Sequence, residues 1–79
     1  MADYQHIVGE AYERLADFII LQAAEDYQEA LKKLRKHPGN TSAAYEVRKI
    51  EIFFRSDWYH QLTDVDGDYL IKRLKGETA

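Results

Sequence analysis

The stretch 31-LKKLRKHPGNTSAAY-45 decides the fold, because it ends one helical pattern and begins another. Pro38 cannot continue a helix, and Gly39 allows a tight turn directly after it. Asn40 or Thr41 can then cap a second helix by accepting from its first free N–H groups. A loop this short joins two antiparallel helices, so the stretch predicts a helical hairpin.

Upstream of this turn, the sequence predicts one long helix over residues 4–36. Apolar residues recur there at steps of three and four, which is the spacing of one helical face. Asp3 can cap its start, whereas Gly9 weakens the first turns by about 1 kcal/mol. The apolar face consists of Tyr4, Val8, Ala11, Tyr12, Leu15, Ile19, Ala23, Tyr27, Ala30, Leu31 and Leu34.

Downstream of the turn, three shorter helices are expected. The second helix ends near residue 54, and its inward positions are Ala43, Val47, Ile50 and Phe54, widened by Tyr45, Ile52 and Phe53. Ser56 can cap a third helix over residues 57–62, and Thr63 can cap a fourth. The fourth helix is expected to turn Val65, Tyr69, Leu70 and Leu74 inward. The prediction is a single all-α domain, residues 1–79, in which a long N-terminal helix forms an antiparallel hairpin with a second helix, followed by two short helices.

The predicted helices differ greatly in length. A helix of 33 residues is about 50 Å long, whereas one of 14 residues is about 21 Å long. The second helix can therefore cover only the C-terminal half of the first. Either the last two helices fold back over the other half, or a second copy of the chain covers it, so a homodimer is possible.

The composition narrows the class of protein. Seventy-nine residues with 46% hydrophobic content allow one folded domain, and the lack of cysteine excludes disulfides and thiolate zinc sites. The longest apolar run, 18-FIIL-21, is far shorter than the ~20 residues that cross a membrane. The first ten residues lack the basic and apolar regions of a signal peptide. We therefore expect a cytoplasmic protein with no membrane partner.

Charge is distributed unevenly along the chain. Residues 1–31 carry seven acids against one base, and residues 32–55 carry seven bases against two acids. The candidate nucleic-acid-binding residues are Lys32, Lys33, Arg35, Lys36, Arg48 and Lys49. They would form a binding patch if the hairpin brought them together. Positive charge at the C-terminus of a helix also has an ordinary explanation, because it complements the helix dipole.

The stretch 62-LTDVDGDYL-70 resembles a calcium loop in its alternating aspartates. Counted from Asp64, however, the sixth position is not glycine and the twelfth is Lys75, a cation where calcium needs a glutamate. Thr63 with Asp66 three residues later is instead typical of a capping box. The sequence therefore predicts a helix start here and no metal site.

Catalytic chemistry is not indicated elsewhere. Glu10 and Glu13, like Asp26 and Glu29, have the spacing of metal-binding carboxylate pairs, but both pairs would lie on one helix about 24 Å apart. His6 lies one turn before Glu10 and lacks further ligands from another element. No phosphate-binding glycine loop and no serine nucleophile with a base can be placed. We expect no enzyme activity and no cofactor.

The segment 53-FFRSDWYH-60 is the most distinctive stretch, with four aromatic residues and an arginine in eight positions. These residue types are enriched at binding hot spots, and they also anchor small cores. Stacking on nucleic-acid bases is a third possibility. The candidate partner-binding residues are Arg55, Trp58 and Tyr59, together with the acidic face of the first helix.

The blocks FFRSDW and LTDVDG, within residues 19–75, resemble those of short uncharacterised proteins encoded in prophages and integrative elements of Gram-positive bacteria. Those proteins carry a similar ERFFRSDWF…LTDVDGEYLIRKL ending. This chain departs from it at Glu51 and Ile52 and has Tyr59 in place of phenylalanine. The resemblance implies a mobile-element origin, a bacterial cytoplasm and an accessory protein that acts by binding, with no functional residue to carry over.

The sequence therefore predicts a non-catalytic, protein-binding accessory factor of a phage or mobile genetic element, with an unknown protein partner. One alternative is a small nucleic-acid-binding regulator that uses the basic end of the hairpin. Another is an inhibitor of a host defence protein, whose acidic helix would occupy a nucleic-acid channel.

Overall fold

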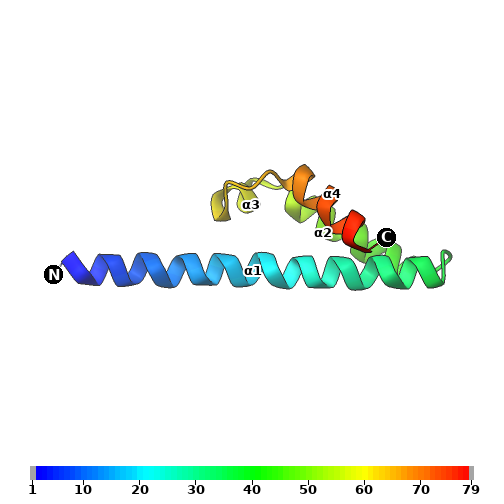
Figure 1. The fold of residues 1–79 in the computed structure, drawn as a ribbon, viewed down its shortest axis with the longest axis horizontal. Helices are drawn as coiled ribbons and strands as arrows, with labels where there is room; N and C mark the ends of the chain where they lie inside the picture. The colour runs from blue at the N-terminus through cyan, green and yellow to red at the C-terminus, as the bar shows by residue number, and fades with distance from the viewer. Residues whose placement is uncertain (1, 79) are drawn as a thin grey trace.

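The structure is a computed structural model that describes residues 2–78, with the side chains of residues 9–78. It contains the helices α1 (Ala2–Lys36), α2 (Thr41–Phe54), α3 (Asp57–Leu62) and α4 (Gly67–Thr78) (Figure 1). The predicted all-α class and long N-terminal helix are confirmed. The predicted cap at Asp3 is wrong, because α1 begins at Ala2 and Asp3 lies within it. The side chains of Tyr4, His6 and Val8 lie outside the described ones.

The turn between α1 and α2 is held by local hydrogen bonds. The His37 amide donates to the Lys33 carbonyl at 2.9 Å, and the Asn40 amide donates to the His37 carbonyl at 2.9 Å. The Asn40 side chain accepts from the Ala43 amide at 3.0 Å, which confirms Asn40 as the cap of α2. Gly39 does not have a positive φ, and a Cβ there would meet nothing. The turn therefore does not depend on a glycine conformation, contrary to the sequence-based expectation.

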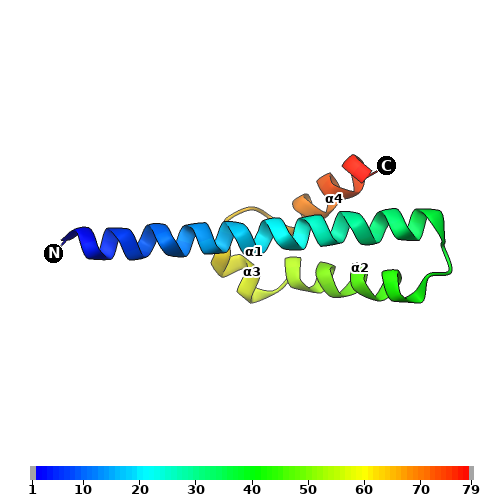
Figure 2. The same cartoon turned by 90° about the horizontal axis from the view of Figure 1, so that it is seen from below.

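α1 is the longest element and determines the shape of the molecule. α2 runs back along its C-terminal half, α3 reaches toward its middle, and α4 turns back toward the C-terminal end (Figures 1 and 2). The molecule measures 56 × 20 × 17 Å, and its radius of gyration is 15.3 Å. A compact chain of this length would have a radius of gyration of about 12 Å. The N-terminal part of α1 projects beyond the other helices, so α3 and α4 do not cover it.

The core lies where the four helices meet. Its buried residues are Tyr27 of α1, Ile50 and Phe54 of α2, Tyr59 of α3, and Ile71 and Leu74 of α4. The Phe54 ring lies edge-on to the rings of Tyr27 and Tyr59, with centroids 5.9 and 5.7 Å away. Edge-to-face contacts of this kind add to the stabilisation from burial. Phe54 therefore connects α1 and α3 through α2.

The fourth helix begins at Gly67, and the predicted cap at Thr63 is wrong. Thr63 instead ends α3 as its C-terminal cap. The Asp66 carbonyl accepts the first helical bond, from the Leu70 amide at 3.0 Å, and the Asp66 carboxylate accepts from the Asp68 amide at 3.1 Å. Asp66 therefore satisfies free N–H groups at the start of α4.

A close backbone contact explains why glycine is the first residue of α4. A Cβ added at Gly67 would collide with the Phe54 carbonyl oxygen and lie 2.8 Å from its carbonyl carbon. Only glycine lets the two backbones approach this closely. The inward face of α4 accordingly consists of Gly67, Ile71, Leu74 and Thr78. Val65 and Tyr69, which were expected to point inward, are exposed.

A polar cluster joins α1, α2 and α4 beside this core. The Tyr27 hydroxyl donates to Glu51 Oε2 at 2.6 Å. Lys75 Nζ lies 3.5 Å from the same oxygen, and Arg55 Nη1 lies 3.8 Å from Glu51 Oε1. Burial, followed by the hydrogen bond to Glu51, raises the pKa of Tyr27 above its usual value. Tyr27 therefore remains a hydrogen-bond donor at neutral pH.

The two buried tyrosines provide a matched pair of substitutions. Tyr27→Phe removes a bond to a carboxylate, and we expect it to lower the free energy of unfolding by about 1.5 kcal/mol. The Tyr59 hydroxyl is buried with no partner among the described atoms, and burial raises its pKa. Tyr59→Phe is therefore expected to be neutral or slightly stabilising, because it removes an unsatisfied polar group.

Urea unfolding of both variants at one protein concentration measures the difference. Phenylalanine keeps each ring in place, so the comparison isolates the two hydroxyl groups. A loss of stability in Tyr59→Phe as large as that in Tyr27→Phe would contradict the hydrogen bonding described for this core.

Candidate protein-binding groove

Many large hydrophobic side chains of this small protein remain exposed. In the described part of the chain they are Tyr12, Leu15, Phe18, Leu21, Tyr45, Ile52, Trp58, Val65 and Tyr69. Single exposed hydrophobic residues are normal on a protein surface, whereas contiguous ones mark interaction sites. The arrangement of these side chains is therefore more informative than their number.

A groove of about 360 Å³ lies between α1 and the junction of α2 with α3. We call it the Trp58 groove; it is lined by Phe18, Ile19, Gln22, Ala23, Asp26, Glu46, Lys49, Ile50, Phe53 and Trp58. Its inner side includes the buried Ile50 and the half-buried Phe53. Phe18 and Trp58 are 63% and 55% exposed. Aromatic side chains therefore remain accessible along an otherwise packed junction.

Local capping determines which aromatic ring of α3 faces this groove. Ser56 Oγ accepts from the Tyr59 amide at 3.1 Å and donates to the Phe53 carbonyl at 2.6 Å, which confirms the predicted cap. α3 starts directly after α2, and its consecutive residues Trp58 and Tyr59 diverge. The Tyr59 side chain enters the core, while the Trp58 ring lies edge-on to the Phe53 ring, with centroids 5.4 Å apart.

Of the three predicted partner-binding residues, the structure places only Trp58 in the groove. Tyr59 has no exposed surface and belongs to the core, so a partner cannot reach it in this structure. Arg55 is exposed, but its Nε lies 2.8 Å from Asp68 Oδ1. It thereby links the end of α2 to the start of α4. These two residues are better explained as parts of the fold.

Sequence analysis did not identify Phe18 as a groove residue. Tyr12, Leu15 and Phe18 recur at steps of three and form an exposed stripe on α1 that ends in the Trp58 groove. Glu10, Glu13 and Asp17 fall on roughly the opposite side of the helix by the same spacing. These three acidic residues therefore point away from the groove, whereas Asp26 of the same helix lines it together with Trp58. The expected combination of Trp58 with the acidic face of α1 stays a prediction.

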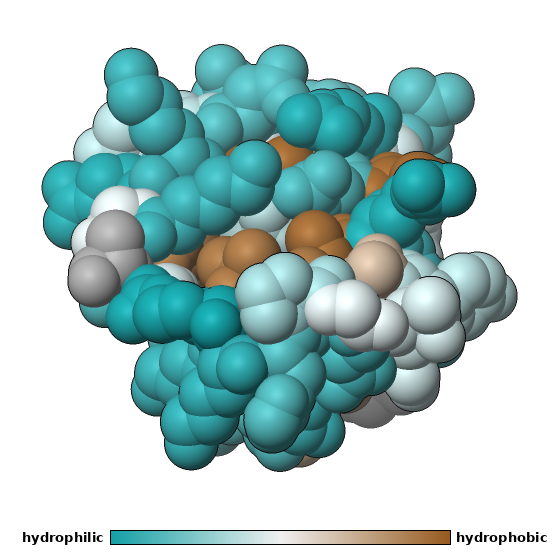
Figure 3. Space-filling view, turned by 90° about the vertical axis from the view of Figure 1, so that its right-hand side faces the viewer, coloured by the Kyte–Doolittle hydropathy of each residue, from teal (hydrophilic) through white to brown (hydrophobic). Residues whose placement is uncertain are grey.

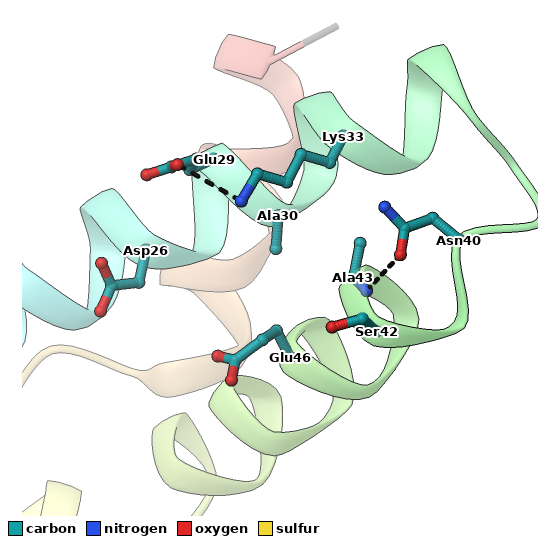
Figure 4. A pocket seen from close by; sticks show the side chains of 8 residues that line it. All are labelled: Asp26, Glu29, Ala30, Lys33, Asn40, Ser42, Ala43 and Glu46. Atoms are coloured by element: carbon teal, nitrogen blue, oxygen red, sulfur yellow. Dashed lines mark hydrogen bonds and ion pairs between the residues drawn. The ribbon is translucent and has the colours of Figure 1, made fainter.

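The basic residues near the turn are interleaved with acidic ones. The six candidates are all exposed: Lys32, Lys33, Arg35, Lys36, Arg48 and Lys49. Lys33 Nζ lies 3.5 Å from Glu29 Oε1, and Lys49 Nζ lies 3.7 Å from Glu46 Oε1. A pocket of about 230 Å³ near Lys33 also contains the carboxylates of Asp26, Glu29 and Glu46 (Figure 4). This side of the turn therefore lacks the unbroken positive surface that a phosphate backbone requires.

The end of the molecule that carries the turn is mostly hydrophilic. Viewed from that end, hydrophobic residues show mainly in the central hollow (Figure 3). Among the described side chains, those of residues 9–78, no group of three or more His, Asp or Glu is placed to hold a metal ion. None of the described helices is long and apolar enough to cross a membrane.

Comparisons with protein family models, curated proteins and solved structures find no match to this chain. The resemblance to mobile-element proteins therefore stays a prediction. The features of the molecule that bear on function are the Trp58 groove and the stripe that leads into it.

Proposed function

We propose that the chain is a non-catalytic protein-binding accessory factor that works in a bacterial cytoplasm for a phage or mobile element. The binding role is supported mainly by one observation: the Trp58 groove is continuous with the exposed stripe of Tyr12, Leu15 and Phe18. Contiguous exposed apolar surface of this kind marks interaction sites. The mobile-element setting is supported by the resemblance of the FFRSDW and LTDVDG blocks alone.

The groove suits an amphipathic helix from another polypeptide. Such helices place apolar residues at every third or fourth position into a hydrophobic groove. Tryptophan is among the residues most enriched at hot spots, and Trp58 is supported from behind by Phe53. Because α3 and its cap hold Trp58 in position, less conformational freedom is lost when a partner binds.

Polar residues at one side of the groove can orient such a helix. Asp26, Glu46 and Lys49 line the groove together with its apolar residues. The apolar part supplies most of the binding free energy, while charged groups at a rim influence specificity and the rate of association. The proposed partner is therefore a helix with one apolar face and charged flanks.

Capture from a bacterial lysate on the immobilised chain tests this function. We expect the wild type to retain a specific protein, and Trp58→Ala to retain it about thirtyfold less, as for loss of a hot-spot residue. Tyr45→Ala is the matched control, because Tyr45 is 67% exposed on α2 and does not line the groove. It should retain as much protein as the wild type.

Two results would contradict the proposal. Equal retention by Trp58→Ala and the wild type would show that the groove is not the binding site. Retention of nucleic acid alone would favour the regulator alternative. In that case Lys36→Glu combined with Lys49→Glu should abolish the retention.

A further inference from the structure

We infer that the helix bound in the Trp58 groove is the exposed stripe of a second copy of this chain, in an antiparallel two-fold contact between two α1 helices. The inference rests on the proposed function, because it names an occupant for the same groove. The inference is supported by the shape, area and charge of the molecular face that contains the groove and the stripe.

Shape is the first argument. The stripe is a ridge and the groove is a hollow, and they lie on the same face because Phe18 belongs to both. A two-fold interface requires one self-complementary surface on each chain. When the stripe of one chain enters the groove of its partner, the partner's stripe enters the groove of the first chain. One contact then covers both exposed features of both chains.

The uncovered part of α1 is the second argument. The radius of gyration, 15.3 Å, exceeds the value of about 12 Å for a compact chain of this length. The excess arises because the N-terminal part of α1 projects beyond the other helices (Figures 1 and 2). An antiparallel partner helix would lie along this projecting part and pack its apolar side.

The exposed apolar area provides about half of a standard interface. Tyr12, Leu15, Phe18 and Trp58 are each more than half exposed. An aromatic side chain has about 150–250 Å², so the exposed parts of the three aromatic rings and of Leu15 supply roughly 400 Å² of apolar surface per chain. A standard interface buries about 800 Å² per partner, and the polar rim of the groove and the flanks of α1 can provide the rest.

Charge is the fourth argument, and it fixes the register. Arg14 and Glu25 are both exposed and lie eleven residues apart, which is about three turns, so they share one side of α1. A two-fold axis midway between them places Arg14 of each chain opposite the partner's Glu25. That midpoint falls beside Ile19, within the groove and next to Phe18. Glu10, Glu13 and Asp17 point away from this contact, so these like charges of the two chains stay apart.

Sedimentation equilibrium over a dilution series tests the inference. The wild type should have twice the monomer mass of 9.3 kDa at high concentration. Phe18→Glu should be monomeric and still helical, because Phe18 is exposed and does not support the core. Tyr45→Glu, with its change at an exposed site outside the groove, should dimerise like the wild type.

Charge reversal tests the register. Arg14→Glu should weaken the dimer about tenfold, and adding Glu25→Arg to it should restore the affinity, because the pair is then reversed rather than lost. Failure of this restoration would overturn the proposed register.

A wild type that stays at 9.3 kDa at all concentrations would overturn the inference. So would a dimer that Phe18→Glu leaves intact. The proposed function would survive either result if Trp58→Ala still abolished capture of a different protein. If only a second copy of the chain is captured, and through Trp58, the inference is supported.

Discussion

Replacing Gly67 with alanine is expected to lower the free energy of unfolding by about 3 kcal/mol, at the upper end for overpacking. The added methyl group would overlap the Phe54 carbonyl oxygen, which belongs to the backbone and cannot rotate away. α4 would have to move away from α2, and the contacts of Ile71 and Leu74 with the core would loosen. In a domain of this size each kcal/mol corresponds to roughly 4–8 °C in the melting temperature.

Gly76→Ala is the matched control, because Gly76 lies in the same helix and a Cβ there meets nothing within 4 Å. Alanine in an open helical position is better than glycine by about 0.5–1 kcal/mol, so this variant should be slightly more stable than the wild type. Urea unfolding of the two variants at one protein concentration gives the comparison. A similar effect at both positions would contradict the close contact between α2 and α4.

Replacing Phe54 with alanine is expected to cost about 3–5 kcal/mol, because it leaves a cavity at the centre of the core. Phe54 is fully buried and contacts the rings of Tyr27 and Tyr59. The total stability of a 79-residue domain is about 4–12 kcal/mol, so the variant would be largely unfolded near the lower limit. Far-UV circular dichroism and thermal unfolding measure the loss.

Ile52→Ala serves as the control for Phe54→Ala, since Ile52 lies two residues away on α2 and is 63% exposed. We expect a change of about 0.5 kcal/mol or less, as for most surface positions. Equal effects of the two substitutions would contradict the placement of Phe54 on the buried face of α2 and of Ile52 on its exposed face.

The features that sequence analysis predicted well are those that depend on neighbouring residues. The caps at Asn40 and Ser56 each bond to an amide three residues later, so their positions can be recognised from a short stretch. The end of α1 before Pro38 has the same local origin. Helices held by such signals were located to within one or two residues.

The start of α4 was missed because one of its two causes is not local. Thr63 and Asp66 have the spacing of a capping box, which favoured an earlier start. The actual start combines the local cap at Asp66 with a contact between Gly67 and the Phe54 carbonyl, thirteen residues away in sequence. The glycine at position 67 was the available signal, and its reason becomes visible only when α2 and α4 are placed together.

The candidate site was only partly predictable for a related reason. α3 has six residues, too few for periodicity to show whether Trp58 or Tyr59 faces the core. The spacing of the stripe residues predicts an apolar face of α1. Whether another helix covers that face depends on how far α3 reaches along α1, which the spacing does not show. The predicted helix lengths indicated this gap and left two ways of covering it, by the last two helices or by a second copy of the chain.

The emission of Trp58 over a dilution series tests the central claim most directly, that the Trp58 groove binds the α1 stripe of a second copy. Trp58 is the only tryptophan in the chain, so its fluorescence reports on the groove alone. We predict a blue-shifted emission at high concentration that moves to the red on dilution, with the same midpoint as the change in mass. Phe18→Glu should show the red-shifted emission at every concentration. Emission that stays constant while the mass changes would contradict the account, because the chains would then associate through another surface.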